Sequence, residues 1–193
     1  MSCAERIDAA ILTDYWLGQL GGGEEERVEE HLFACEECSE RLAEVQAMAE
    51  GVRELARAGS LMMVVSESFL KHAAGHGLQV RRYDPPAGGS VECTVAAEDD
   101  FLVGGLAANL SAAKRIDLSL RDPNGNEQFR LVDIPFDTGS GGVLWQMSIT
   151  FAKAAPTSTM VARLIDVGES GGESLVGEYT FNHTRTLPGP GAW

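Results

Sequence analysis

Hydrophobic residues near the N-terminus recur every three or four positions, which is the spacing of one face of an α-helix. The first such face consists of Ile7, Ile11, Leu12, Tyr15 and Trp16. Three consecutive glycines at positions 21–23 end this helix. Glutamates at 24–26 favour the start of a second helix, because the helix dipole attracts negative charge there. The pattern therefore predicts two helices joined by a glycine turn.

Two further helices are predicted before residue 76. The third runs from about Glu37 to Ala58, where Gly59 ends it. Its apolar stripe consists of Leu42, Val45, Met48, Ala49, Val52 and Leu55. The fourth runs from Leu61 to about Ala73, behind a capping serine at position 60. The apolar residues of this fourth helix cover more than one face, so they exceed what burial on one side requires.

After residue 76 the period changes, and short alternating or apolar runs predict β-strands. These runs are 78–80, 91–95, 116–120, 129–131, 144–149, 161–165 and 176–181. Clusters of Pro, Gly, Asn and Asp separate the runs, as is typical of an antiparallel β-sandwich. The predicted fold is α+β in three parts: a helical domain at 1–76, an all-β sandwich at 77–185 that we expect to sense a signal or regulate the helical domain, and a flexible tail at 186–193.

Charge and composition exclude several kinds of partner. The 193 residues have a formal net charge of −14, so nucleic acids and anionic membranes would repel the chain. No apolar run approaches the roughly 20 residues that cross a bilayer, and the N-terminus lacks the pattern of a secretory signal. We therefore expect a cytoplasmic location. Thiols stay reduced there, so the four cysteines indicate metal or redox chemistry before disulfides.

The residues His31, Cys35 and Cys38 form an H-x3-C-x2-C motif. Two thiolates separated by two residues can bind one metal ion from a single turn, and the histidine lies one helical turn earlier on the same side. Three such ligands suit tetrahedral zinc, which needs a fourth. Cys3 is the candidate, because the first helix must pack against the second to bury its apolar face. We therefore predict a structural zinc site of Cys3, His31, Cys35 and Cys38.

Two other interpretations of the motif stay open at this stage. The cysteines and the histidine are also compatible with ordinary buried residues of a small helical domain. The C-x2-C pair also occurs in thioredoxin-like redox proteins, although no strand precedes it here to build that fold.

Together with the run from Tyr15 to Leu20, the motif resembles the zinc-associated anti-sigma domain. In that family a Y-L-D-G-E-L-like segment ends the first helix, and H-L-x2-C-x2-C follows a short acidic helix. The resemblance covers residues 1–76, with Leu17 in place of the usual aspartate and Glu5 where the family has its first ligand. If Cys3 does not reach the metal, then Glu5, Asp8 or water completes the shell.

The resemblance implies a function in transcription. Members of the family bind and sequester sigma factors of the extracytoplasmic-function type, so we expect a cytoplasmic anti-sigma factor that negatively regulates transcription initiation and is not an enzyme. Zinc is the expected cofactor, either as a structural staple or as a redox switch. The resemblance also implies that the fourth helix grips the sigma factor; the alternative is that this helix caps the β-domain. The expected contact residues are Leu61, Met62, Val65, Phe69 and Leu70.

The remaining features of the sequence define the rival functions. Residues 1–76 carry 15 acidic and 6 basic side chains, which would steer the domain toward a basic protein surface. In the sandwich we expect Cys93 to be a core thiol and, with only His183 in the strands, no second metal site. One rival function is a zinc-containing interaction adaptor. The other is a thiol oxidoreductase that uses Cys35 and Cys38.

Overall fold

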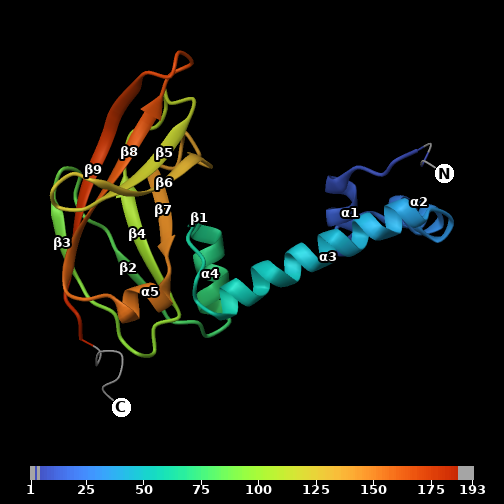
Figure 1. Cartoon of the computed structure of the whole chain (residues 1–193), viewed down its shortest axis with the longest axis horizontal. Helices are drawn as coiled ribbons and strands as arrows, with labels where there is room; N and C mark the ends of the chain where they lie inside the picture. The colour runs from blue at the N-terminus through green and yellow to red at the C-terminus, as the bar shows by residue number, and fades with distance from the viewer. Residues whose placement is uncertain (1–2, 4, 187–193) are drawn as a thin grey trace. The chain divides into compact units, whose positions relative to one another are not determined.

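The computed structural model describes residue 3 and residues 5–186 and divides into two compact units (Figure 1). The first unit ends at Arg57, and the second begins at Ala58. The boundary therefore differs from the one predicted at residue 76, because the segment after Ala58 packs with the β-sheets. Except for Thr186, the predicted tail at 186–193 lies outside the described residues.

Three helices form the first unit, and they agree with the first three helices predicted from the hydrophobic period. They are α1 (Ala9–Trp16), α2 (Gly22–Ala34) and α3 (Glu36–Arg57). Asp8 caps α1, since its carboxylate accepts a hydrogen bond from the Ala10 amide at 2.8 Å. Within the described part of the chain, no helix has the length and apolar character that crossing a membrane requires.

Few side chains of this unit are fully buried. Among its described residues they are Leu12, Val28 and Cys38, one from each helix. Beside them, the guanidinium group of Arg53 lies 4.5 Å from the centroid of the Trp16 ring, in a cation–π contact. Domains this small rarely fold on so little buried surface without a disulfide or a metal.

The second unit is a sandwich of two β-sheets. One sheet has the strand order β1-β7-β4-β2, and the other has the order β3-β9-β8-β5-β6. The strands are β1 (Met63–Val65), β2 (Val80–Tyr83), β3 (Ser90–Cys93), β4 (Phe101–Ala107), β5 (Ile116–Arg121), β6 (Glu127–Ile134), β7 (Gly142–Met147), β8 (Ser158–Val167) and β9 (Glu173–His183). The two helices of this unit are α4 (Glu67–Gly75) and α5 (Ile149–Ala154).

The inner faces of the two sheets meet in one hydrophobic core. Trp145 from β7 and Phe181 from β9 meet edge to face, with ring centroids 6.4 Å apart. The hydroxyl of Tyr179 on β9 donates to the carbonyl of Ala107 on β4 at 2.5 Å, which adds a polar link between the sheets. These buried aromatic residues anchor the sandwich.

The predicted sandwich was antiparallel throughout, and this part of the prediction is wrong. Strand β2 pairs with β4 in parallel, and β3 pairs with β9 in parallel, whereas the other pairs are antiparallel. After β2 the chain crosses to the other sheet, forms β3 there and returns as β4. Parallel neighbours need such a crossover in place of a hairpin.

Strand β4 was absent from the sequence prediction, although its residues 102–106 are buried. Two glycines in its centre interrupt the hydrophobic alternation. A Cβ atom at Gly104 would lie 3.0 Å from Cζ of Phe181, and one at Gly105 would collide with the carboxylate of Asp84. The glycines therefore leave room for neighbouring side chains, which a strand pattern in the sequence does not reveal.

The predicted fourth helix, from Leu61 to Ala73, is wrong in its first part. Residues Met63–Val65 form β1, which pairs with β7. Helix α4 begins only after Ser66, whose hydroxyl accepts a hydrogen bond from the Phe69 amide at 3.1 Å. Two consecutive β-branched residues, Val64 and Val65, favour the strand. The helix cap is therefore Ser66, and not Ser60 as the sequence predicts.

Helix α4 belongs to the sandwich. Leu70 is buried, and the Phe69 ring meets the Phe101 ring edge-on, with centroids 5.8 Å apart. Glu67 forms an ion pair with Arg82 of β2 at 2.6 Å. The five predicted sigma contacts (Leu61, Met62, Val65, Phe69 and Leu70) therefore lie in the β-unit and do not form a separate gripping helix.

A buried carboxylate connects β5 to its neighbours. Asp117, with its side chain 2% exposed, pairs with Arg130 at 2.9 Å and Arg115 at 3.3 Å. It also accepts a hydrogen bond from the Asp133 amide at 2.9 Å. Burial by itself raises the pKa of Asp117, but this amide and the two guanidinium groups hold it below its usual value.

We expect Asp117→Asn to lower the free energy of unfolding of the sandwich by about 1–3 kcal/mol at pH 7, because two buried charge-assisted contacts lose their anion. A lowered pKa in the folded state gives stability that is present above about pH 4 and lost as the pH falls. The deficit of the variant should therefore shrink at pH 3. Urea unfolding monitored by tryptophan fluorescence at both pH values measures it, and equal deficits would contradict this assignment.

Candidate metal centre

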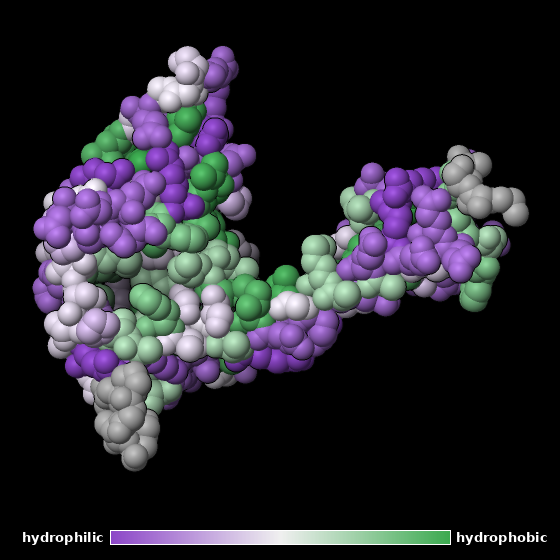
Figure 2. All heavy atoms as spheres, viewed as in Figure 1, coloured by the Kyte–Doolittle hydropathy of each residue, from purple (hydrophilic) through white to green (hydrophobic). Residues whose placement is uncertain are grey.

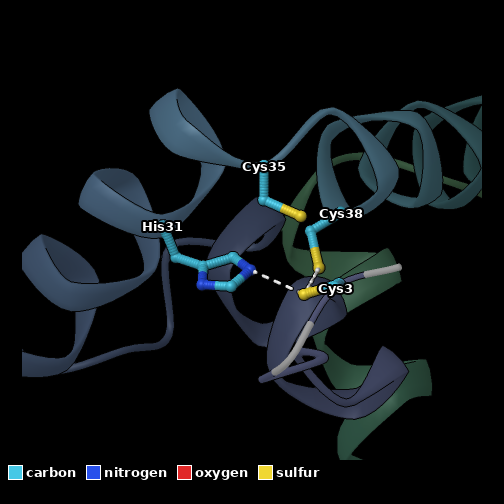
Figure 3. A group of neighbouring side chains, drawn as sticks. All are labelled: Cys3, His31, Cys35 and Cys38. Atoms are coloured by element: carbon cyan, nitrogen blue, oxygen red, sulfur yellow. Dashed lines mark hydrogen bonds between the residues drawn. The ribbon is translucent and has the colours of Figure 1, made fainter. Parts of the chain in front are cut away.

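Four candidate ligands converge at the junction of α2 and α3 (Figure 3). The ligand atoms of Cys3, His31, Cys35 and Cys38 all lie within 4.8 Å of one another. The Cys3 sulfur is 3.4 Å from Nε2 of His31 and 3.9 Å from the Cys38 sulfur. Zinc bonded at about 2.3 Å to sulfur and about 2.0 Å to nitrogen places tetrahedral ligand atoms roughly 3.5–3.8 Å apart. The spacing of the cluster therefore fits one zinc ion.

The turn between the helices positions three of the four side chains. His31 lies in the last turn of α2, Cys35 follows that helix with an extended backbone, and Cys38 lies in the first turn of α3. The Ser39 hydroxyl donates to the carbonyls of Leu32 at 2.8 Å and Cys35 at 3.1 Å, which holds the end of α2 against the start of α3.

The N-terminal segment brings Cys3 to the motif. The Cys3 amide donates to the Glu37 carboxylate at 3.0 Å, and Arg6 pairs with the same carboxylate at 3.5 Å. Further along the segment, the guanidinium group of Arg41 donates to the carbonyl of Ile7. Contacts with α3 therefore hold the segment that carries Cys3, and the predicted fourth residue joins the cluster.

The alternative candidates for the fourth position lie outside the cluster. Asp8 caps α1, and Glu5 is exposed. The sequence analysis did not find Glu37, Ser39 or Arg41 as positioning residues. Their side chains act through hydrogen bonds with backbone groups, over 34 residues for Glu37 and Arg41, and a motif search for metal ligands detects only the ligands.

Comparison with known proteins places this geometry in a family. Residues 9–39 match the model of a family described as "Putative zinc-finger". Residues 9–39 are therefore a zinc-finger of the kind that is typical of anti-sigma factors. The match includes His31, Cys35 and Cys38, and the structure adds Cys3 from outside the matched range. We call residues 1–57 the zinc-finger domain.

Two further comparisons concern the chain as a whole. No curated protein sequence matches it. Among solved structures, CopC from Methylosinus trichosporium OB3b is similar at 14% sequence identity and a TM-score of 0.27, with 66% of this chain and 98% of CopC covered.

The thiols of the zinc-finger domain differ in acidity. A backbone hydrogen bond at Cys38 and a side-chain hydrogen bond with Cys3 lower the pKa of Cys35 to about 7. Burial and the neighbouring Cys35 thiol raise the pKa of Cys3 to about 11. Several thiolates this close repel one another unless a cation lies among them. A divalent metal ion would displace the thiol protons and remove that repulsion.

The ligand set is closed. Three cysteines and one histidine would fill all four positions of a tetrahedral zinc ion, so no position would remain for a reacting water. Cys38 is fully buried, and the other three residues are half-buried. A redox-active C-x2-C pair acts with its thiols exposed and free of competing ligands, which this arrangement does not offer. The arrangement therefore suits a structural metal centre.

Removal of the buried ligand tests the centre. We expect Cys38→Ser to lose its zinc and most of the helical content of the zinc-finger domain, because three buried side chains cannot stabilise it alone. Metal analysis and far-ultraviolet circular dichroism measure both effects. A chelator should unfold the wild-type domain in the same way.

The matched control is Cys93→Ser, which changes the remaining cysteine of the chain and lies in the sandwich. It should retain about one equivalent of zinc per chain, as expected for one tetrahedral site. A Cys38→Ser protein that is metal-free and keeps its full helical content would contradict the structural role.

Proposed function

We propose that this chain is an anti-sigma factor that sequesters a sigma factor of the extracytoplasmic-function type and so represses transcription initiation. The observation that carries the proposal is the match of residues 9–39 to the zinc-finger family. The cluster that Cys3 forms with the three cysteine and histidine residues of the motif supports it. The proposed action is binding and not catalysis, with zinc as a structural cofactor. Because sigma factors act in the cytoplasm, we propose that location for the zinc-finger domain.

The charge of the zinc-finger domain supports a basic protein partner. Residues 1–57 carry 14 acidic and 5 basic side chains, a net charge of −9 out of −14 for the whole chain. Sigma factors bind promoter DNA and therefore present basic surfaces. Opposite charges on the two proteins accelerate their association. The negative charge of the zinc-finger domain also disfavours nucleic acid as its partner.

An exposed apolar stripe on α3 supplies a candidate contact surface. Met48, Val52 and Leu55 follow one another at helical spacings of four and three, with exposed fractions of 67%, 48% and 50%. Figure 2 shows green hydrophobic residues among purple hydrophilic ones along this helix. Apolar side chains at this spacing fit a hydrophobic groove on a partner. We therefore propose this stripe as the sigma contact, in place of the residues predicted at 61–70.

The direct experiment uses a sigma factor of the extracytoplasmic-function type from the same cell. The zinc-loaded chain should bind it in a pull-down and abolish its transcription in vitro with core RNA polymerase at about one equivalent, as expected for a one-to-one complex. If the chain binds another protein but not a sigma factor, the adaptor function replaces the proposal. If reduced chain without metal turns over insulin disulfides, the oxidoreductase function replaces it.

A matched pair of variants tests the α3 stripe. We expect Val52→Glu to weaken sigma binding at least tenfold, which is about 1.4 kcal/mol, because a carboxylate would enter the apolar contact. Zinc content and helicity should stay unchanged. The control is Val132→Glu, which alters a 58% exposed valine on β6 of the sandwich and should leave the affinity unchanged. Isothermal titration calorimetry measures both, and equal affinities would contradict the stripe as the contact.

A further inference from the structure

A second cluster of metal-binding side chains lies inside the sandwich. Residues from both sheets and from α5 surround a cavity of about 120 Å³. Its lining contains the thiol of Cys93, the imidazole of His183 and three thioethers, from Met62, Met147 and Met160. Three of the six methionines in the chain therefore line this one cavity. Cys93, which is the one cysteine outside the zinc-finger cluster, lines it as well.

The β-sheet places the thiol beside the imidazole. Cys93 on β3 and His183 on β9 are direct partners in a parallel strand pair. Paired residues on adjacent strands project to the same face, and neighbouring strands lie about 4.8 Å apart. Both residues line the same cavity, so backbone pairing places one sulfur donor and one nitrogen donor side by side in its wall.

Two polar atoms of the cavity residues lack a partner. Nε2 of His183 and Nε1 of Trp145 are buried and accept or donate no hydrogen bond within the described part of the chain. Burial lowers the pKa of His183, although a hydrogen bond with the backbone of Ala155 opposes this. Because Nε2 has no partner, the hydrogen bond with Ala155 is assigned to Nδ1, which leaves a lone pair on Nε2. Histidines that bind metals have the same arrangement, with one nitrogen on the metal and the other on a backbone group.

The chemistry of the lining selects one kind of ion. Carboxylates are absent from the residues that line the cavity, so hard divalent cations would find no anionic oxygen ligand. Thiolate and thioether ligands together select Cu(I) over zinc. A monovalent ion bound to one thiolate is neutral overall, which suits an apolar interior. The ring of Trp145, 1% exposed, adds an aromatic surface that attracts a cation.

We propose that this cavity binds one Cu(I) ion through Cys93, His183 and thioethers from Met147 and Met160. On binding, the Cys93 thiol releases its proton to solvent and a copper–sulfur bond forms, while copper stays in the +1 state. This site is separate from the zinc cluster and does not depend on the proposed anti-sigma function. It also replaces the expectation from the sequence that the sandwich holds no second metal site.

Methionine methyl groups report on the cavity independently of the zinc-finger thiols, which also attract Cu(I). In this experiment the full, zinc-loaded chain is labelled with ¹³C at its methionine methyl groups. One equivalent of Cu(I) is then added in the absence of oxygen. We expect the methyl resonances of Met147 and Met160 to shift, and the resonance of Met48 on α3 to stay in place. If Cu(I) only releases zinc and the cavity methionines do not respond, the proposal is overturned.

Variants assign the ligands. Cys93→Ser should lower the affinity of the cavity for Cu(I) at least tenfold. Competition with the chelator bicinchoninate measures this affinity. Met160→Leu conserves volume and should also weaken it, which keeps the test decisive if Cys93→Ser does not fold. Met48→Leu is the control and should change nothing. Near-ultraviolet circular dichroism verifies folding, and wild-type affinity in folded Cys93→Ser or Met160→Leu would overturn the assignment.

Discussion

The convergence of three thiols and one imidazole is the constraint on which the zinc-finger domain depends. Its described residues include only three fully buried side chains, each worth about 2 kcal/mol of hydrophobic stabilisation. That sum does not offset the conformational entropy of ordering more than fifty residues. A metal ion bound at the junction of α2 and α3 would join the N-terminal segment to both helices, and it would supply the free energy that the small core lacks.

The sandwich depends on a different kind of interaction. Its core between two sheets contains many more buried hydrophobic side chains than the zinc-finger domain does. The segment at 61–70 shows how the two units differ. From the sequence, its excess of apolar residues predicts a partner-binding helix. In the structure these residues form β1 and pack α4 onto the sandwich. The exposed apolar residues of the zinc-finger domain lie instead on α3, where Met48, Val52 and Leu55 lack a covering element of their own domain.

The two units therefore differ in how they can respond to their surroundings. In the zinc-finger domain, the candidate metal ligands join the N-terminal segment, α2 and α3, so loss of a bound metal would loosen the packing of α3. In the sandwich, Trp145 and His183 line a cavity that is already formed by the sheets. A cation bound there would satisfy Nε2 of His183 and leave the backbone pairing of β3 with β9 in place.

Taken alone, the sequence determined the features that arise within one helical turn or one helix. The spacing of His31, Cys35 and Cys38 places three ligands together wherever α2 meets α3, and the hydrophobic period placed the first three helices. Tertiary structure decided that Cys3 joins them, that β2 and β3 pair in parallel with later strands, and that Cys93 meets His183. These pairs are far apart in the chain, and their proximity depends on packing, which no local pattern encodes.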